Sequence, residues 1–458
     1  MNALGVLLHE ALARDGAILD GQSAPVAYAE LRSTAGLVAG ALAAERLGLD
    51  EPVHVVIGNR PADFAALLGV WMAGGVAVPV HVGAQTATVA RLAALTQARL
   101  LIDGAVVRPI AGAAPPPRDV LRGAALIVST SGSTGLPKGV VLGHKRFAAK
   151  LDVLDALVRL RPSDRVVVPL QLTFVFGLWV ALLTLRSGGT LALLPRFSLA
   201  ALAEQVEGAA VLAAVPSTLR LLQAEFALRA PGPRLLLTGG EALGAPLRSA
   251  LAAQWPGTDI HDLYGSTETG ACDFSQPGSA PAQEAGAIGR PTAGVTYRIE
   301  AGELQVRSPF GMLGYLDDPG LTEAAFQDGF FRTGDIAVQH AGGQVELVGR
   351  SKEIVSRGGN KVAPQEVDNL LGSHAEIAAA LSAGAPHEIL GEALHSVVVP
   401  RAGCTPDPAA LRAWLAERLE RYKLPETIQV VDVLPTGSTG KVSRALLRER
   451  LVARLASS

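Results

Sequence analysis

Two segments rich in glycine and hydroxyl residues stand out as candidates for phosphate chemistry. The first, TSGSTGLPKG, covers residues 130–139, and the second, PTGSTGKVS, covers residues 435–443. Both contain Gly-Ser-Thr-Gly followed by a lysine, which is Lys138 in the first segment and Lys441 in the second. Glycines let the backbone approach a ligand closely, hydroxyls donate hydrogen bonds and lysine supplies positive charge. Both segments therefore predict loops that bind or act on phosphate groups.

Neither segment is a Walker A loop, the phosphate loop of many nucleoside triphosphatases. Gly132 and Lys138 have the spacing of that motif. However, Pro137 stands where its second glycine belongs, and Gly139 stands where its magnesium-binding hydroxyl belongs. The second segment has a proline at the first glycine position and a valine after the lysine. These departures argue against a P-loop enzyme.

Alternating strand and helix patterns position the first segment. Up to about Tyr297, short apolar runs alternate with helical patterns, and the predicted strands cover residues 52–58, 75–80, 125–130, 189–194, 209–216 and 233–240. Such alternation predicts a large, layered α/β domain with mostly parallel sheets. Ligands bind such sheets at the carboxyl ends of strands. The segments STSGSTG and TGGEAL directly follow two of the predicted strands, so both lie where a ligand site is expected.

The pattern changes after Tyr297 to shorter, more polar strands. Turns at residues 301–302 and 342–343 predict hairpins, which would form a small β-subdomain. The remaining residues contain strands and helices of their own, enough for a small α+β domain. We place the boundary at Arg350, which gives an N-terminal domain of residues 1–350 and a C-terminal domain of residues 351–458.

The composition limits the class of protein. Of the 458 residues 49% are hydrophobic, and the net charge is −2. The chain can build more than one core, and this charge gives no basic field for nucleic acid. The two cysteines, Cys272 and Cys404, lack metal-ligand spacing. We therefore expect neither a disulfide framework nor a zinc site. We expect a cytoplasmic location.

One uncharged stretch, residues 166–185, has the length of a membrane span. Pro169, Gln171, Thr173 and Gly177 interrupt it. We interpret it as a buried strand over residues 165–170, a loop and a buried helix from about Gly177, because buried α/β elements form continuous apolar runs.

The first glycine-rich segment resembles the phosphate loop of the adenylate-forming superfamily, which contains acyl-CoA synthetases, adenylation domains of peptide synthetases and luciferases. Further segments resemble the motifs of this superfamily in the same order along nearly the whole chain: YAELRSTAGLVAGAL, GVWMAGGVAVPV, TGGEAL, LYGSTETG, GELQVRSPFGMLGYLDDP, FRTGDIA, GRSKEIVSRGGNKVAPQEVD and LPTGSTGKVSR. The complete series is far more specific than any single segment. The resemblance implies that a carboxylic acid attacks ATP to give an acyl-adenylate and pyrophosphate, after which a thiol of CoA or of a carrier protein's phosphopantetheine forms a thioester.

The resemblance also implies roles for the residues that would bind Mg²⁺ and ATP. The phosphate loop would hold the β- and γ-phosphates through Thr130, Ser131, Gly132, Ser133, Thr134, Gly135 and Lys138. Around the nucleoside, Tyr264 would stack on adenine, Asp335 would accept both ribose hydroxyls with Arg350 nearby, and the adenine side would be lined by Gly239, Gly240 and Glu241. Thr267 would lie near the α-phosphate. Glu268 would bind Mg²⁺, an ion that keeps most of its waters and suits a lone carboxylate.

In the C-terminal segments the resemblance implies a mobile catalytic residue. Lys441 would enter the site for adenylation, where a cation stabilises the negative charge of the transition state. The small domain would then rotate about a hinge at Lys352. Gly358 and Gly359 would leave space for the pantetheine arm in the second step.

The acid pocket is expected at Phe174, Val175, Gly177, Val215 and Gly265. PLQLTFVFGL resembles the acid-entry motif of CoA ligases, although Phe174 stands where many of them have histidine. The segment has no aspartate that could bind an ammonium group, which argues against an α-amino acid. Its apolar residues favour a carboxylic acid with an uncharged acyl or aryl tail.

Three functions remain open. The leading one is an acid–CoA ligase, and the alternative is loading of the acid onto a carrier protein. The third is a non-catalytic relative or an adenylate-using oxidase, against which the filled motif positions argue. The oligomeric state is open, with a homodimer among the options.

Overall fold

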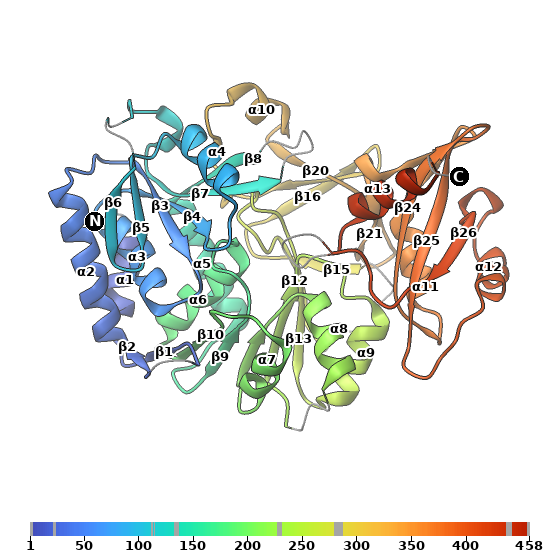
Figure 1. The fold of residues 1–458 in the computed structure, drawn as a ribbon, viewed down its shortest axis with the longest axis horizontal. Coiled ribbons are helices and arrows are strands. Elements are labelled where there is room, and N and C mark those ends of the chain that lie inside the picture. Colours follow the sequence, from blue (N-terminus) through green and yellow to red (C-terminus); the bar gives the residue numbers. More distant parts are fainter. Residues whose placement is uncertain are drawn as a thin grey trace.

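Three β-sheets organise the chain in the computed structural model, which describes residues 3–21, 24–110, 113, 115–131, 137–226, 231–278, 287–436 and 442–455. The first two sheets belong to the larger lobe of the molecule, and the third belongs to the C-terminal lobe, coloured orange to red in Figure 1.

The first sheet has seven strands in the order β18-β8-β7-β4-β3-β5-β6. Its strands are β3 (Pro52–Ile57), β4 (Val76–His81), β5 (Leu100–Asp103), β6 (Val106–Pro109), β7 (Ala124–Ser131), β8 (Pro137–Gly143) and β18 (Gly314–Tyr315). The helices α2 (Tyr28–Ala44), α3 (Pro61–Met72) and α4 (Thr86–Thr96) belong to the same part of the chain. Strands β5, β3, β4 and β7 run parallel, as the strand–helix alternation predicts.

The second sheet has fourteen strands, most of them in the order β16-β17-β20-β21-β15-β14-β13-β12-β11-β9-β10-β1-β2. Its parallel part contains β1 (Ala17–Leu19), β9 (Arg165–Val168), β10 (Thr190–Leu193), β11 (Val211–Ala213), β12 (Leu235–Gly239) and β13 (Asp259–Tyr264). The helices of this region are α1 (Ala3–Ala11), α5 (His144–Val158), α6 (Val175–Ser187), α7 (Leu199–Val206), α8 (Pro216–Glu225) and α9 (Ala245–Gln254).

The other strands of the second sheet pair antiparallel. They are β2 (Val26–Ala27), β14 (Phe274–Gln276), β15 (Ala287–Pro291), β16 (Thr296–Glu300), β17 (Glu303–Arg307), β19 (Phe326–Gln327), β20 (Phe330–Gln339) and β21 (Val345–Arg350), with α10 (Pro319–Ala324) inserted before β19. Hairpins β16–β17 and β20–β21 turn at the two predicted places. Ala301 and Gly302 both have positive φ, which suits the tight turn between β16 and β17.

The third sheet has the order β23-β22-β25-β24, with β26 paired to β25. It contains β22 (Val355–Arg357), β23 (Asn360–Val362), β24 (Ile377–His387), β25 (Gly391–Pro400) and β26 (Thr427–Val430), together with α11 (Pro364–Gly372), α12 (Pro408–Ala416) and α13 (Arg444–Leu455). It has its own buried cluster, which includes Val367, Leu394 and Leu411. The Asp407 carboxylate caps α12 by accepting hydrogen bonds from two amides of the first turn.

The main core lies in the large lobe and includes two helices that are buried nearly all round, α3 and α6. Trp71 of α3 and Trp179 of α6 are each about 1% exposed. The uncharged stretch at residues 166–185 therefore forms strand β9 and helix α6, as predicted, with the helix starting at Val175. None of the helices in the described ranges is long and apolar enough to cross a membrane.

Candidate active site

The predicted phosphate loop starts at the carboxyl end of β7. In the β7–β8 hairpin, Thr130 lies directly opposite Lys138, so the predicted phosphate lysine sits beside this strand end. Gly132, Ser133, Thr134 and Gly135 lie outside the described residues, and the side chain of Ser131 is likewise not described. Their contacts with phosphate remain a prediction.

Lys138 and Glu268 contact the same side chain, that of Tyr315. The ammonium of Lys138 lies 5.3 Å from the centroid of this ring, a cation–π distance. The Tyr315 hydroxyl donates a 3.1 Å hydrogen bond to Oε1 of Glu268. The predicted phosphate ligand and the predicted magnesium ligand are thus joined through a residue that had no predicted role.

The predicted nucleoside residues form a second group of contacts. The Tyr264 hydroxyl donates a 2.6 Å hydrogen bond to Oδ2 of Asp335, and Nε of Arg350 lies 2.8 Å from Oδ1. Asp335 and Arg350 are direct partners in the β20–β21 ladder. Burial and the Asp335 carboxylate raise the pKa of Tyr264, and the ion pair with Asp335 raises the pKa of Arg350. Both side chains therefore stay protonated donors to the carboxylate.

The turn after β12 fits tightly against its neighbours. A Cβ at Gly239 would lie 2.4 Å from the carbonyl oxygen of Leu263, and Gly240 has a φ of +81°. The Glu241 carboxylate accepts 3.0 Å hydrogen bonds from the amide and hydroxyl of Ser217 at the start of α8. Glycine is required here by space and by backbone conformation, and Glu241 fixes the turn to α8.

The segment that follows the Thr267–Glu268 loop has an unusual backbone conformation. Three consecutive residues after it, Gly270, Ala271 and Cys272, have φ values of +93°, +65° and +49°. Left-handed φ values cost free energy for residues other than glycine, so surrounding contacts must hold them.

A buried lysine supplies part of that support. Lys150 of α5 is 0% exposed, and its ammonium donates to the carbonyl oxygen of Cys272 at 2.7 Å and to Oγ1 of Thr292 at 3.2 Å. Asp273 accepts a hydrogen bond from the Thr269 hydroxyl. Burial raises the pKa of Asp273 to about 6, and Lys150 acts in the opposite direction. Neither Lys150 nor Asp273 had a predicted role.

The predicted acid-pocket residues lie at the start of α6 and at strand ends. Phe174 is the residue before α6, Val175 and Gly177 are in its first turn, and Val215 precedes α8. A Cβ at Gly177 would lie 2.8 Å from the carbonyl oxygen of Gln171, and one at Gly265 would lie 2.5 Å from the amide of Cys272.

The loop before Phe174 is fixed from the first sheet. Asn59 donates to the carbonyl oxygen of Leu170 at 2.9 Å and accepts from the amide of Leu172 at 3.0 Å. Within α6, Phe176 stacks on Trp179 with centroids 5.5 Å apart. The loop at the start of the predicted pocket segment is therefore held by Asn59.

The predicted second-step residues lie at the entry to the third sheet. Gly358 and Gly359 form the β22–β23 turn with φ values of +54° and +84°, and a Cβ at Gly359 would meet nothing within 4 Å. Lys352 is exposed in a short 3₁₀ turn (Ser351–Glu353). Lys441 lies outside the described residues.

The base of the Lys441 segment is tied to the predicted hinge. Thr436 and Val442 form an isolated antiparallel bridge. Arg444, two residues further on, lies 2.6 Å from the Glu353 carboxylate and 2.8 Å from that of Asp368. The chain on either side of Lys441 is thus anchored, and Arg444 connects it to the turn that contains Lys352.

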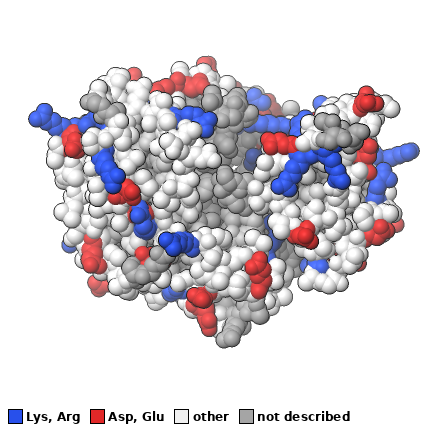
Figure 2. All heavy atoms as spheres, in the orientation of Figure 1, with Lys and Arg blue, Asp and Glu red and all other residues white. Residues whose placement is uncertain are grey.

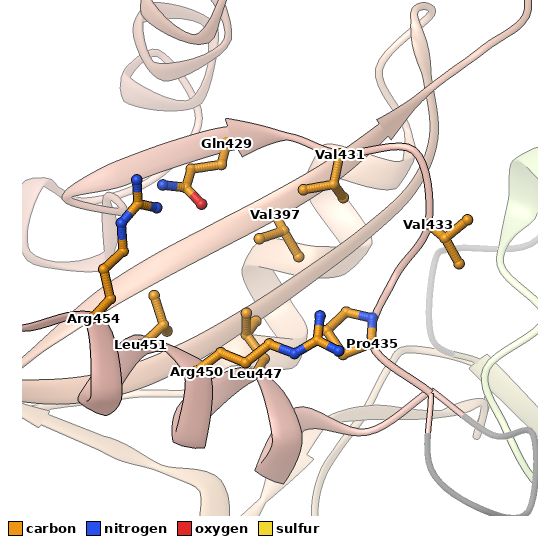
Figure 3. A pocket seen from close by; sticks show the side chains of 9 residues that line it. All are labelled: Val397, Gln429, Val431, Val433, Pro435, Leu447, Arg450, Leu451 and Arg454. Atoms are coloured by element: carbon orange, nitrogen blue, oxygen red, sulfur yellow. The ribbon is translucent and has the colours of Figure 1, made fainter.

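A separate groove of about 200 Å³ lies between the third sheet and α13. Val397, Val431 and Leu447 line it, Arg450 points toward Pro435 and Arg454 points toward Gln429 (Figure 3). Of the predicted catalytic, nucleotide and acid-pocket residues that the structure describes, none lines this groove. On the face in Figure 2, acidic and basic side chains are interspersed over both lobes.

The family model of the AMP-binding enzyme matches residues 10–122 and 110–316, and that of the AMP-binding enzyme C-terminal domain matches residues 366–441. The chain belongs to the AMP-binding enzyme family.

Individual relatives cover nearly the whole chain. The sulfoacetate–CoA ligase of Cupriavidus necator is 31% identical over 92% of this chain and 91% of its own length. The feruloyl-CoA synthase of an Amycolatopsis species is 31% identical over 92% of this chain and 93% of its own. The ATP-bound structure of MatB from Rhodopseudomonas palustris has a TM-score of 0.86 at 26% identity and covers 98% of this chain and 99% of that one.

These comparisons confirm the predicted superfamily, the α/β fold and an enzyme of the AMP-forming acyl-CoA synthetase type. The roles of individual site residues and the domain boundary at Arg350 remain predictions.

Proposed function

We propose that the protein is an AMP-forming ligase that activates an apolar acyl or aryl carboxylic acid with ATP and transfers it to CoA. The observation that carries the proposal is the order of the contacts in the site. Asp335 contacts Tyr264, the loop after Tyr264 leads to Thr267 and Glu268, and Glu268 contacts Tyr315, which meets Lys138. This order is that of ribose, α-phosphate, magnesium and outer phosphates in ATP.

The charges of these contacting residues suit a nucleotide bound with Mg²⁺. Asp335 accepts hydrogen bonds, as a group that binds two ribose hydroxyls must. Glu268 is a carboxylate, the ligand that Mg²⁺ takes together with phosphate oxygens and water. When bound, Mg²⁺ would neutralise phosphate charge. Lys138 would bind the outer phosphates, and the glycines at Gly239 and Gly240 would admit the nucleoside close to the backbone.

Lys441 would supply the remaining charge for adenylation. The acid carboxylate attacks the α-phosphorus, the bond to pyrophosphate breaks, and negative charge builds on the oxygens between them. We propose that Lys441 stabilises this charge and then leaves as residues 351–458 rotate at Lys352. Gly358 and Gly359 would then face the pantetheine arm, and the thiol would displace AMP from the acyl-adenylate. We place this reaction in the cytoplasm.

The proposed acid class follows from the pocket side chains. Phe174, Val175 and Val215 are apolar, and Val175 is 4% exposed. Buried charge on the acid would find no partner among these three side chains. An aryl or acyl tail is therefore favoured over an acid with a second charged group.

Identifying the thioester by mass tests the acid and the acceptor together. The enzyme is incubated with MgATP, a panel of aryl, fatty and α-amino acids, and either CoA or a phosphopantetheinylated carrier protein. The proposal predicts an acyl-CoA from an apolar acid. A thioester only on the carrier protein would favour the alternative, and products only from amino acids would contradict the proposed pocket.

A further inference from the structure

Tyr315 lies between the two charged groups that the proposed function assigns to MgATP. Its side chain is largely buried, with 6% exposure. The ring meets the Lys138 ammonium at 5.3 Å, and the hydroxyl donates to Glu268 Oε1 at 3.1 Å. The ring and the hydroxyl of one side chain thus contact a cation and a carboxylate of the same predicted site.

The backbone of Tyr315 is fixed to the strand that carries Lys138. Strand β18 pairs antiparallel with β8, and Tyr315 lies opposite Val140. The amide of Leu316 donates to the carbonyl oxygen of Gly139 at 2.8 Å, and the amide of Tyr315 donates to Thr322 Oγ1 at 2.9 Å. The position of the ring relative to Lys138 is therefore set by sheet pairing.

The same segment also fixes the backbone of Glu268. The amide of Met312 donates to the carbonyl oxygen of Glu268 at 2.8 Å. At Gly311 a Cβ would lie 3.0 Å from that oxygen, so the two segments approach closely. Residues 311–315 hold Glu268 at its main chain through Met312 and at its carboxylate through Tyr315.

The Tyr315 hydroxyl is suited to remain a donor. A phenol hydroxyl carries its proton at neutral pH, so it can donate to a carboxylate. Hydrogen bonds to ionised acceptors are stronger than neutral ones.

We propose that Tyr315 is a positioning residue for MgATP: its hydroxyl orients the Glu268 carboxylate toward the metal ion, and its ring holds the Lys138 ammonium on the phosphate side. One carboxylate oxygen is held by the hydroxyl, and the other would remain for the ion. This inference rests on the proposed function of Glu268 and Lys138.

Substitutions at Tyr315 separate its two contacts. Tyr315→Phe removes the hydroxyl and keeps the ring, whereas Tyr315→Leu removes both. Tyr297→Phe is the matched control, because its hydroxyl contacts Gln339 and Gly343 on the hairpins and not the predicted site. Calorimetric titration with ATP, at a series of Mg²⁺ concentrations and without any acid, measures the contacts independently of turnover.

The expected result is specific for each variant. Tyr315→Phe lowers the Mg²⁺-dependent gain in ATP affinity about ten-fold or more, since one hydrogen bond to a charged group is lost. It leaves metal-free ATP affinity within about two-fold. Tyr315→Leu weakens both affinities, and Tyr297→Phe weakens neither. Tyr315→Phe binding with the Mg²⁺ dependence of the wild type would overturn the inference.

A double-mutant cycle tests the coupling itself. In a Glu268→Gln background, Tyr315→Phe is expected to add little further loss, because the charged acceptor is already absent. Fully additive losses would show that Tyr315 acts independently of Glu268. If the wild type binds MgATP but no acid supports catalysis, the proposed function fails while these binding results still decide the role of Tyr315.

Discussion

The hydroxyl of Tyr264 lies 2.6 Å from Oδ2 of Asp335 and joins the end of β13 to β20. Arg350 takes the other carboxylate oxygen, so Asp335 is oriented from two sides before any nucleotide enters. Preorganised acceptors bind ligands without the cost of ordering them.

Tyr264→Phe is expected to raise the KM for ATP about ten-fold and to change kcat less. A ten-fold change corresponds to the low end of the free energy that a hydrogen bond to a charged group contributes. Steady-state kinetics with varied ATP measure the split. An unchanged KM would mean that the hydroxyl has no part in orienting Asp335.

Lys150→Met is expected to destabilise the fold by about 3 kcal/mol, because the variant removes one of the two donors to the Cys272 carbonyl, the other being the Thr292 hydroxyl, and takes the nearby cation from Asp273. Urea unfolding measures the free energy. Lys145→Met is the matched control on the same helix, since Lys145 is exposed. Equal stability of the two variants would contradict the supporting role of Lys150.

The raised pKa of Asp273 predicts that the free energy of unfolding depends on pH. Its pKa in the folded protein is about 6, above the ordinary value of 3.8, so the folded state holds the proton more tightly than the unfolded chain. This stabilisation is fully present below about pH 4 and is lost as pH rises through about 6, by about 3 kcal/mol in total.

The check compares unfolding free energies of wild type and Asp273→Asn between pH 4 and pH 7. The variant cannot titrate at this position, so it should gain stability relative to the wild type as the pH rises. A constant difference between the two proteins would place the pKa of Asp273 near its ordinary value.

Lys441→Ala is expected to separate the two half-reactions. Adenylate formation should fall by several orders of magnitude, as expected when a transition-state charge loses its partner. Thioester formation from supplied acyl-adenylate should be largely spared, because the lysine has left the site by then. Equal loss of both half-reactions would argue against rotation of the C-terminal domain.

Much of the architecture follows from local sequence patterns. Apolar runs rich in valine and leucine predict β3, β4, β7 and β12, and the glycine-rich turns that follow two of them locate the site. Helix α6 is recognisable because an uncharged run broken by Pro169 and Gly177 fits a buried strand and helix better than a span.

The residues that escaped prediction depend on contacts between distant segments. Lys150 lies in a helix, where lysine is normally exposed, and only the fold places it under Cys272. Tyr315 approaches Lys138 and Glu268 because β18 pairs with β8, a pairing between short segments that local periodicity does not indicate. Long-range pairing therefore limits what the motifs alone reveal.

Acid-dependent ATP–pyrophosphate exchange measures adenylate formation at this site. An apolar or aryl acid, together with Mg²⁺, is expected to support exchange by the wild type, and Glu268→Gln or Lys441→Ala is expected nearly to abolish it. Absence of exchange with every acid of the panel, or full exchange by both variants, would contradict adenylate formation at this site.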